Sequence, residues 1–217
     1  RWLVDQRKVD STMALLSESE QQQVRDAITR IERDTDAELV TVLAPQADDY
    51  TYIPLLWAGI LALLIPGAIN YFPQWLGAAE LLIVQWACFA VLAVVFRLPA
   101  VTTRLIPRRV RFWRAANLAR RQFLEQNLHH TQDGTGMLIF VSEAERYVEI
   151  LVDRGISSRL GDDTWQGIVS SFTEQVKRGQ TLQGFLACIE ACGEHLTRHV
   201  PATHERNELP NRLIVLE

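Results

Sequence analysis

Two long apolar segments near the middle of the chain constrain its fold more than any other feature. Residues 52–72 read YIPLLWAGILALLIPGAINYF, and residues 79–96 read AELLIVQWACFAVLAVVF. Between positions 52 and 96 the only charged residue is Glu80. Each segment is close to the ~20 apolar residues that cross a bilayer core. The pair therefore predicts a transmembrane hairpin. Two buried helices of a soluble core are the alternative, but adjacent segments of this purity are rare in a soluble protein of 217 residues.

Several residues inside the hairpin refine this prediction. Pro66 and Gly67 predict a kink, which transmembrane helices tolerate better than soluble ones. Gln85 is polar within the second segment, so its amide is expected to face the partner helix. Tyr71 and Trp75 lie at the turn, where aromatic side chains favour the membrane interface.

The distribution of arginine predicts the orientation. The second apolar segment is followed by eight Arg residues, at positions 97, 104, 108, 109, 111, 114, 120 and 121. The loop 73–78 contains neither Lys nor Arg. The positive-inside rule places residues 97 onward in the cytoplasm. Two spans return the chain to its starting side, so residues 1–50 are expected there too, with the loop 73–78 outside.

The same arginines bear on the class of ligand. The formal net charge is −4, which gives no overall nucleic-acid signal, and no nucleic-acid partner is expected. An Arg cluster beside a transmembrane segment is better explained by lipid headgroups, with Phe112 and Trp113 inserted into the membrane surface. The lipid bilayer is thus the first predicted partner. The three cysteines, Cys88, Cys188 and Cys192, show no disulfide framework, which fits a reducing compartment.

The rest of the chain alternates helical and strand patterns. Ser17 and Glu20 form a capping-box pattern at the start of the first helix. The predicted elements are helix 17–35, strand 38–44, helix 108–130, strands 135–142 and 147–153, and helices 162–178 and 181–199. Neither side of the hairpin has enough strands for a stable sheet, so the two sides are expected to form one α/β domain. The predicted parts are 1–51, hairpin 52–98, 99–200 and a tail 201–217 without assigned structure.

These patterns resemble the TPM domain family. The residues that carry the resemblance are Asp36–Val42, Gly134–Val141, Glu145-Arg146, Glu149–Gly155 and Trp165. The chain is similar to bacterial members with a membrane insertion. The resemblance implies a small α/β/α sandwich interrupted by the hairpin, and a multi-pass protein of the cell inner membrane. Plant thylakoid relatives have been assigned acid phosphatase activity and a role in photosystem II repair, and some family members bind a divalent metal. The resemblance implies these activities as expectations for this chain. Two departures are the hairpin itself and Asp36-Ala37 in place of the usual Thr-Gly.

Acidic residues at strand ends are the candidate metal ligands. Asp153 closes a predicted strand, and Asp162 and Asp163 open the following helix. Ligand sites in α/β sheets form beyond the carboxyl ends of strands, and clustered carboxylates can hold Ca²⁺ or Mg²⁺. A metal-held phosphate can then be hydrolysed. The structural alternative is that Asp162 or Asp163 caps the helix and favours its positive end.

Other chemistry-bearing residues have structural explanations. Glu38 heads a strand and is expected to pair with an Arg such as Arg146, or to join the acidic site. Soft ligands also share one helix stripe, namely Cys188, Cys192, His195 and His199. One straight helix cannot wrap four ligands around Zn²⁺, so core thiols beside surface histidines are the simpler interpretation. The sequence contains no Ser/His/Asp nucleophile signature, P-loop or dinucleotide fingerprint.

The function that follows is a membrane-anchored domain that binds other membrane proteins, in their assembly or quality control. The motive is an anchor joined to a compact domain without a complete catalytic constellation. The alternative is a divalent-metal-dependent phosphatase at the membrane surface, motivated by the resemblance and by the three aspartates. The sequence leaves open whether the protein is an enzyme.

Overall fold

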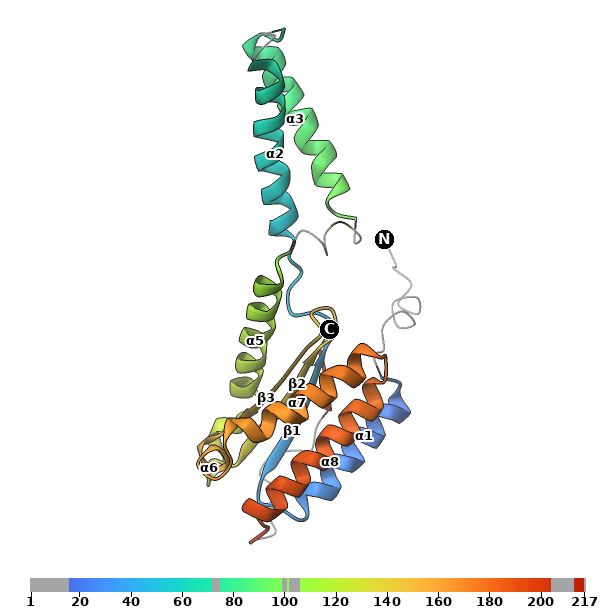
Figure 1. The fold of residues 1–217 in the computed structure, drawn as a ribbon, viewed down its shortest axis with the longest axis vertical. Coiled ribbons are helices and arrows are strands. Elements are labelled where there is room, and N and C mark those ends of the chain that lie inside the picture. Colours follow the sequence, from blue (N-terminus) through green and yellow to red (C-terminus); the bar gives the residue numbers. More distant parts are fainter. Residues whose placement is uncertain (1–15, 72–74, 99–100, 102–105, 204–212, 217) are drawn as a thin grey trace, which may run out of the picture. The chain divides into compact units, whose positions relative to one another are not determined.

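The computed structural model describes residues 16–71, 75–98, 101, 106–203 and 213–216. It divides into two compact units, one made of Arg1–Ala47 and Phe112–Glu217 and the other of Asp48–Arg111. The first unit is a mixed α/β fold and the second contains the helical hairpin (Figure 1).

A four-stranded sheet forms the centre of the first unit, in the order β3-β2-β1-β4. The strands are β1 (Glu38–Ala44), β2 (Gly136–Ser142), β3 (Tyr147–Val152) and β4 (Leu213–Val215). Strand β1 pairs in parallel with β2 and β4, whereas β2 and β3 are antiparallel. Every residue of β1 and β2 is buried, as expected for strands covered on both faces. The chain before the hairpin therefore pairs directly with the chain after it.

Helices cover both faces of this sheet. Helices α1 (Glu18–Glu32), α7 (Asp162–Lys177) and α8 (Thr181–His199) pack on one face, around a core that includes Leu39, Ile139 and Phe172. Helix α5 (Arg108–Glu125) and the 3-10 turn η2 (Leu128–His130) supply the other face, whose core includes Val42 and Phe140. The short helix α6 (Arg154–Ser157) connects β3 to α7. The layering is helix, sheet, helix.

Most of the predicted elements are confirmed to within a few residues, and the differences have local causes. The predicted capping box of α1 is present, with the Glu20 carboxylate accepting from the Ser17 N–H at 2.8 Å. The helix predicted over 108–130 instead ends at Glu125, because Asn127 adopts a left-handed backbone with φ of 57°. Part of the unassigned tail forms β4.

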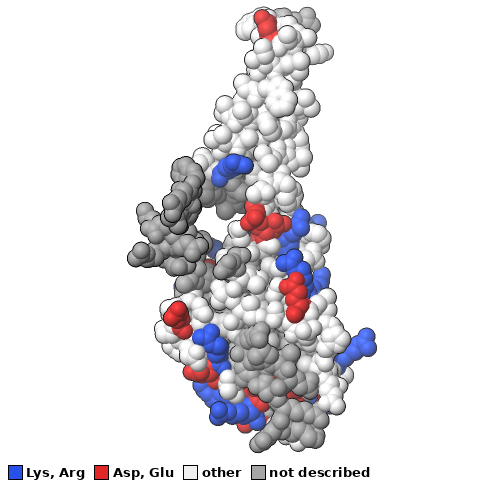
Figure 2. Space-filling model, turned by 180° about the vertical axis from the view of Figure 1, so that it is seen from behind, with Lys and Arg blue, Asp and Glu red and all other residues white. Residues whose placement is uncertain are grey.

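The second unit contains α2 (Tyr52–Tyr71) and α3 (Ala78–Val95), which pack side by side (Figure 1). Both are long and apolar enough to cross a membrane, judged by length and composition. Figure 2 shows one face of the molecule, on which the hairpin surface is almost entirely uncharged. Near the turn, the Asn70 side chain accepts from the Leu76 N–H at 2.9 Å and donates to the Leu76 carbonyl at 3.1 Å. The Asn70 side chain therefore ties the end of α2 to Leu76, just before α3 begins.

The prediction for Gln85 is confirmed. Its amide nitrogen donates to the Leu63 carbonyl of α2, at 3.3 Å. Helix α2 continues through Pro66. Because Pro66 has no backbone N–H, a carbonyl group in the preceding turn of α2 lacks its usual donor within the helix. The Gln85 amide supplies a donor from outside the helix to this turn.

Candidate functional site

Asp153 lies at a different edge of the sheet from the one that the sequence argument assumed. Strand β3 runs antiparallel to β2, so the end of β3 lies beside the start of β2. The Asp153 N–H accordingly donates to the Gly136 carbonyl, at 2.9 Å. The Asp153 carboxylate caps α6, accepting from the Arg154 N–H at 2.7 Å. Asp153 is therefore remote from the carboxyl ends of β1 and β2.

Asp162 and Asp163 occupy the first turn of α7, directly after Gly161 at the N-cap. Both side chains are exposed, at the positive end of the helix dipole. Among the residues that the structure describes, no three His, Cys, Asp or Glu side chains form a group able to hold a metal ion. Within the described ranges, Asp153, Asp162 and Asp163 therefore do not form the donor set expected for Ca²⁺ or Mg²⁺.

The carboxyl edge of β1 and β2 carries a different carboxylate, Glu145, which is only 3% exposed. Its Oε2 accepts hydrogen bonds from the Ala47 N–H, at 3.1 Å, and from the Ser142 hydroxyl. We name this arrangement the Glu145 clasp. It ties the segment that leaves β1 to the turn between β2 and β3. Sequence reasoning missed this role, because only the folded sheet brings Ala47 beside Ser142.

Glu38 lies at the opposite edge, where its carboxylate neighbours that of Glu32. Glu38 is aligned with Gly136 at the start of β2, whereas Arg146 follows the far end of that strand. Six residue steps along a strand cover about 20 Å, so the predicted pairing of Glu38 with Arg146 is wrong. Burial, together with the charge of Glu38, raises the pKa of Glu32 to about 8, although the Leu39 N–H donates to Glu32 at 2.9 Å and opposes the shift.

The cysteines and histidines of α8 do not gather into a metal site in the described chain. Cys188 and Cys192 are free and buried in the core. The pKa of Cys192 is raised, mainly by its hydrogen bond with the Cys188 thiol and secondly by its burial. His195 stacks edge-on against Trp165, with ring centroids 6.3 Å apart. These contacts support the interpretation of Cys188 and Cys192 as core thiols.

The two adjacent aromatic residues of α5 make different contacts. Phe112 packs on Tyr147 of β3, with ring centroids 5.5 Å apart, and therefore contacts the sheet. Trp113 is 57% exposed, and the Arg114 guanidinium carbon lies 5.1 Å from its ring centroid. Both residues expected at a membrane surface are exposed, because Phe112 is 43% exposed although it contacts Tyr147.

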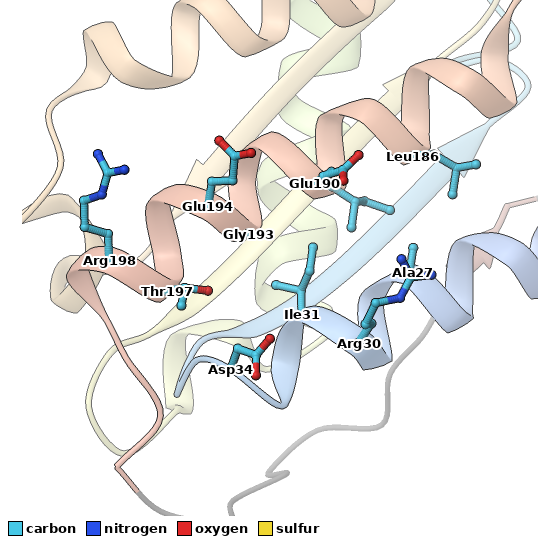
Figure 3. Close-up of a pocket in the computed structure, with 11 residues that line it drawn as sticks. Ala27, Arg30, Ile31, Asp34, Leu186, Glu190, Gly193, Glu194, Thr197 and Arg198 are labelled. Atoms are coloured by element: carbon cyan, nitrogen blue, oxygen red, sulfur yellow. The ribbon is translucent and has the colours of Figure 1, made fainter.

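A groove of about 670 Å³ lies between α1 and α8 (Figure 3). Its lining is Ala27, Arg30, Ile31, Asp34, Leu186, Ile189, Glu190, Gly193, Glu194, Thr197 and Arg198. The two helices approach closely at Gly193, where an added Cβ would lie 2.6 Å from the Ile31 Cδ1. Apolar side chains thus form its floor.

Charged residues of both signs line the same groove. Arg30 and Asp34 come from α1 and the turn after it, and Glu190, Glu194 and Arg198 come from α8 (Figure 3). The described lining contains no His, Cys or Ser to serve as a nucleophile or as an imidazole base. An apolar floor with charges of both signs is suited to binding a polypeptide segment.

Comparison with known proteins agrees with this architecture. The fold and its layers define a mixed α/β domain interrupted by two apolar helices. Residues 101–195 match the family model of the TPM domain, which confirms the resemblance seen in the sequence over that part of the chain. No curated protein matches.

A solved structure extends the likeness in fold to nearly the whole chain. It is the NMR structure of the BA42 protein from the psychrophilic bacterium Bizionia argentinensis, with a TM-score of 0.60. The comparison covers 95% of this chain and 99% of BA42, at 18% sequence identity. At this identity the likeness is one of fold.

Proposed function

We propose that this protein is a membrane-anchored TPM-type domain that binds other membrane proteins, in their assembly or quality control. The observation that carries the anchor is α3, in which no residue is buried. Its large apolar side chains are exposed, among them Ile83, Val91 and Val94. Apolar surface in water costs about 25 cal/mol per Å², so a bilayer is the environment that this helix favours.

The proposed topology is a multi-pass inner-membrane protein with both aqueous parts cytoplasmic and the turn outside. The pairing of β1 with β2 supports one part of it, because strands in one sheet require both ends of the hairpin on the same side. The arginines after α3 support the cytoplasmic side.

Cysteine labelling in intact cells tests this topology. In a Cys88→Ala background, Trp75→Cys should react with an impermeant maleimide, since Trp75 is 83% exposed beside the turn. Gln126→Cys should react only after the cells are opened. Labelling of position 126 in intact cells would reverse the orientation.

The proposed binding surface is the groove between α1 and α8. Its support is the combination of an apolar floor at Ile31 and Gly193 with charges of both signs around it. A photo-reactive residue in place of Thr197, which lines the groove, should give a defined adduct with another membrane protein in native membranes. The same residue at Gln166, exposed on α7, serves as the matched control. Equal yields of adduct from positions 197 and 166 would contradict the assignment of the groove as the binding surface.

A divalent-metal-dependent phosphatase is the second candidate. Its support is the matched family model, which is named for a TPM phosphatase. Purified protein with Mg²⁺ or Ca²⁺ and a generic phosphoester tests it. Turnover that is abolished by Asp162→Ala with Asp163→Ala, in a protein that keeps its fold, would establish the enzyme. Turnover at the background rate in the unaltered protein would eliminate it.

A further inference from the structure

Two residues at the middle of α3 are unusual for a surface in contact with lipid. Gln85 and Trp86 lie at the centre of this 18-residue helix, whose length is about 27 Å. Trp in membrane proteins favours the two interfaces, where its N–H meets water or headgroups. Trp86 is instead 71% exposed near the midpoint of the span. Both side chains therefore place polar groups at the depth where lipid offers no partner.

The hydrogen bonds of these two residues are incomplete within one copy of the chain. Gln85 uses one amide N–H on the Leu63 carbonyl. Among the described residues, its Oε1 has no donor and the Trp86 indole N–H has no acceptor. The ring of Trp86 is held edge-on to Phe89, with centroids 6.2 Å apart. The hairpin thus presents an unused acceptor on Gln85 and an unused indole donor on Trp86, besides the second N–H of the Gln85 amide.

A mainly apolar groove of about 380 Å³ lies at the same height between α2 and α3. It is lined by Gly59, Ala62, Leu63, Gln85, Trp86 and Phe89. An added Cβ at Gly59 would meet nothing within 4 Å, so this wall of the groove is open. Small residues at such positions let a second helix approach closely.

We propose that the occupant of this groove is a second copy of the hairpin. The two copies are related by a two-fold axis, and Trp86 of each copy enters the groove of the other. The indole N–H of each copy then donates to the Gln85 Oε1 of the other. In a two-fold contact residue i meets j and j meets i, so one arrangement pairs the Gln85 Oε1 and the Trp86 N–H of both copies. This inference rests on the membrane insertion in the proposed function.

Energy transfer between labelled copies in vesicles tests the proposal. The full chain carries a donor or acceptor dye at Gln166→Cys in a Cys88→Ala background, because Cys188 and Cys192 are buried. It is reconstituted into vesicles of phosphatidylethanolamine and phosphatidylglycerol and diluted with lipid. The unaltered hairpin should give a saturable dimer.

Loss of either hydrogen-bonding group should weaken that dimer. Gln85→Leu and Trp86→Phe should each raise the dissociation constant at least about fivefold. The double variant should be little weaker than either single one, because both changes remove the same bond. Trp57→Phe, on α2 and outside the groove lining, is the matched control and should leave the dimer unchanged.

A second pair of variants tests the groove itself. Gly59→Leu fills it and should also weaken the dimer at least about fivefold. Gly67→Leu is the matched control, because an added Cβ there also meets nothing within 4 Å and Gly67 does not line the groove. Equal effects at positions 59 and 67 would overturn the assignment of the contact.

The outcomes separate failure of this inference from failure of the proposed function. If the chain resists alkaline extraction from membranes but stays monomeric at every dilution, the second copy is excluded and the anchor stands. If alkaline extraction releases the chain, both fail. A photo-reactive residue in place of Phe89, which lines the groove, that captures another membrane protein and never a second copy would assign the groove to a different partner.

Discussion

Strand β1 and helix α3 are both apolar, but their surroundings differ completely. All seven residues of β1 are buried by neighbouring strands and by helices on both faces. None of the 18 residues of α3 is buried. Apolar composition alone therefore does not identify a core. A seven-residue strand can be covered by its own protein, whereas a single hairpin of this length leaves most of its surface for another environment to cover.

The two regions also treat polar groups differently. In the α/β unit the buried carboxylate of Glu145 receives donors from Ala47 and Ser142. In the hairpin, Gln85 has one partner, the Leu63 carbonyl. A buried polar group whose hydrogen bonds are all made within the fold stabilises its own unit. A polar group in an apolar span that still lacks a hydrogen-bond partner favours association with another molecule.

The largest difference is expected from removing an aromatic side chain in the sheet. Phe140→Ala should reduce the free energy of unfolding of the α/β unit by about 3–5 kcal/mol, because Phe140 is fully buried. Leu82→Ala, on the exposed face of α3, should change it by less than about 0.5 kcal/mol. Urea unfolding in mild detergent, followed by pulse proteolysis, measures both. Similar losses from the two variants would refute the contrast.

A charge on the exposed surface of α3 is expected to have the next largest effect. Val91→Arg should oppose membrane insertion by up to about 2.5–3.5 kcal/mol, the cost of Arg at a helix centre, because Val91 is exposed on an apolar span. The fraction of chain that resists alkaline extraction measures insertion. Gln166→Arg, on the exposed surface of α7, is the control and should leave that fraction unchanged. Full extraction resistance with Arg at position 91 would argue against a lipid-facing surface.

Glu32 predicts a pH dependence that belongs to the α/β unit. Its pKa is about 8 in the fold and near 4.5 in the unfolded chain, so the folded state retains the proton between these values. Its contribution to stability is complete below pH 4.5 and is lost as the pH rises to about 8. Glu32→Gln keeps an acceptor for the Leu39 N–H and removes the titration.

The variant should therefore gain a few kcal/mol, up to about 4, over the unaltered protein between pH 5 and pH 8.5. Chemical unfolding at the two pH values measures this difference. Glu18→Gln, exposed on the same helix, should keep the slope of the unaltered protein. A slope that survives Glu32→Gln would assign the pH dependence to other groups.

The smallest effect concerns two helical glycines in the α/β unit. Gly184→Ala should cost about 1–2 kcal/mol, because its Cβ would lie 2.6 Å from the buried ring of Phe172. Gly167→Ala meets nothing within 4 Å and should stabilise by about 0.5–1 kcal/mol. Thermal unfolding of both variants measures the difference in sign. Stabilisation by both variants would show that helix propensity outweighs packing at position 184.

Local patterns were sufficient for most of the individual elements. The strand predicted over 38–44 matches β1, because β-branched and apolar residues form an uninterrupted run. The two apolar segments match α2 and α3 to within one residue at each end. Their lengths and the absence of Lys and Arg are properties of the sequence alone.

Pairing between distant segments was not accessible in the same way. Strand β4 is only three residues long. It forms by pairing with Thr41–Leu43 of β1, which is far away in the chain. The antiparallel direction of β3 decides at which edge Asp153 lies. The Glu145 clasp likewise depends on the register between β1 and β2. Sequence patterns do not fix strand order or direction, and these decide the position of each carboxylate.

The central position of β1 has a consequence for how the protein is made. Strand β1 leaves the ribosome first among the strands, yet its two neighbours, β2 and β4, follow only after the hairpin and after α8. At about 5–20 residues per second, the delay before β4 emerges is roughly ten to thirty seconds. Until β4 emerges, the fully buried strand β1 keeps at least one edge without its final partner. Newly made chains are therefore most vulnerable to aggregation and to chaperone capture in this window.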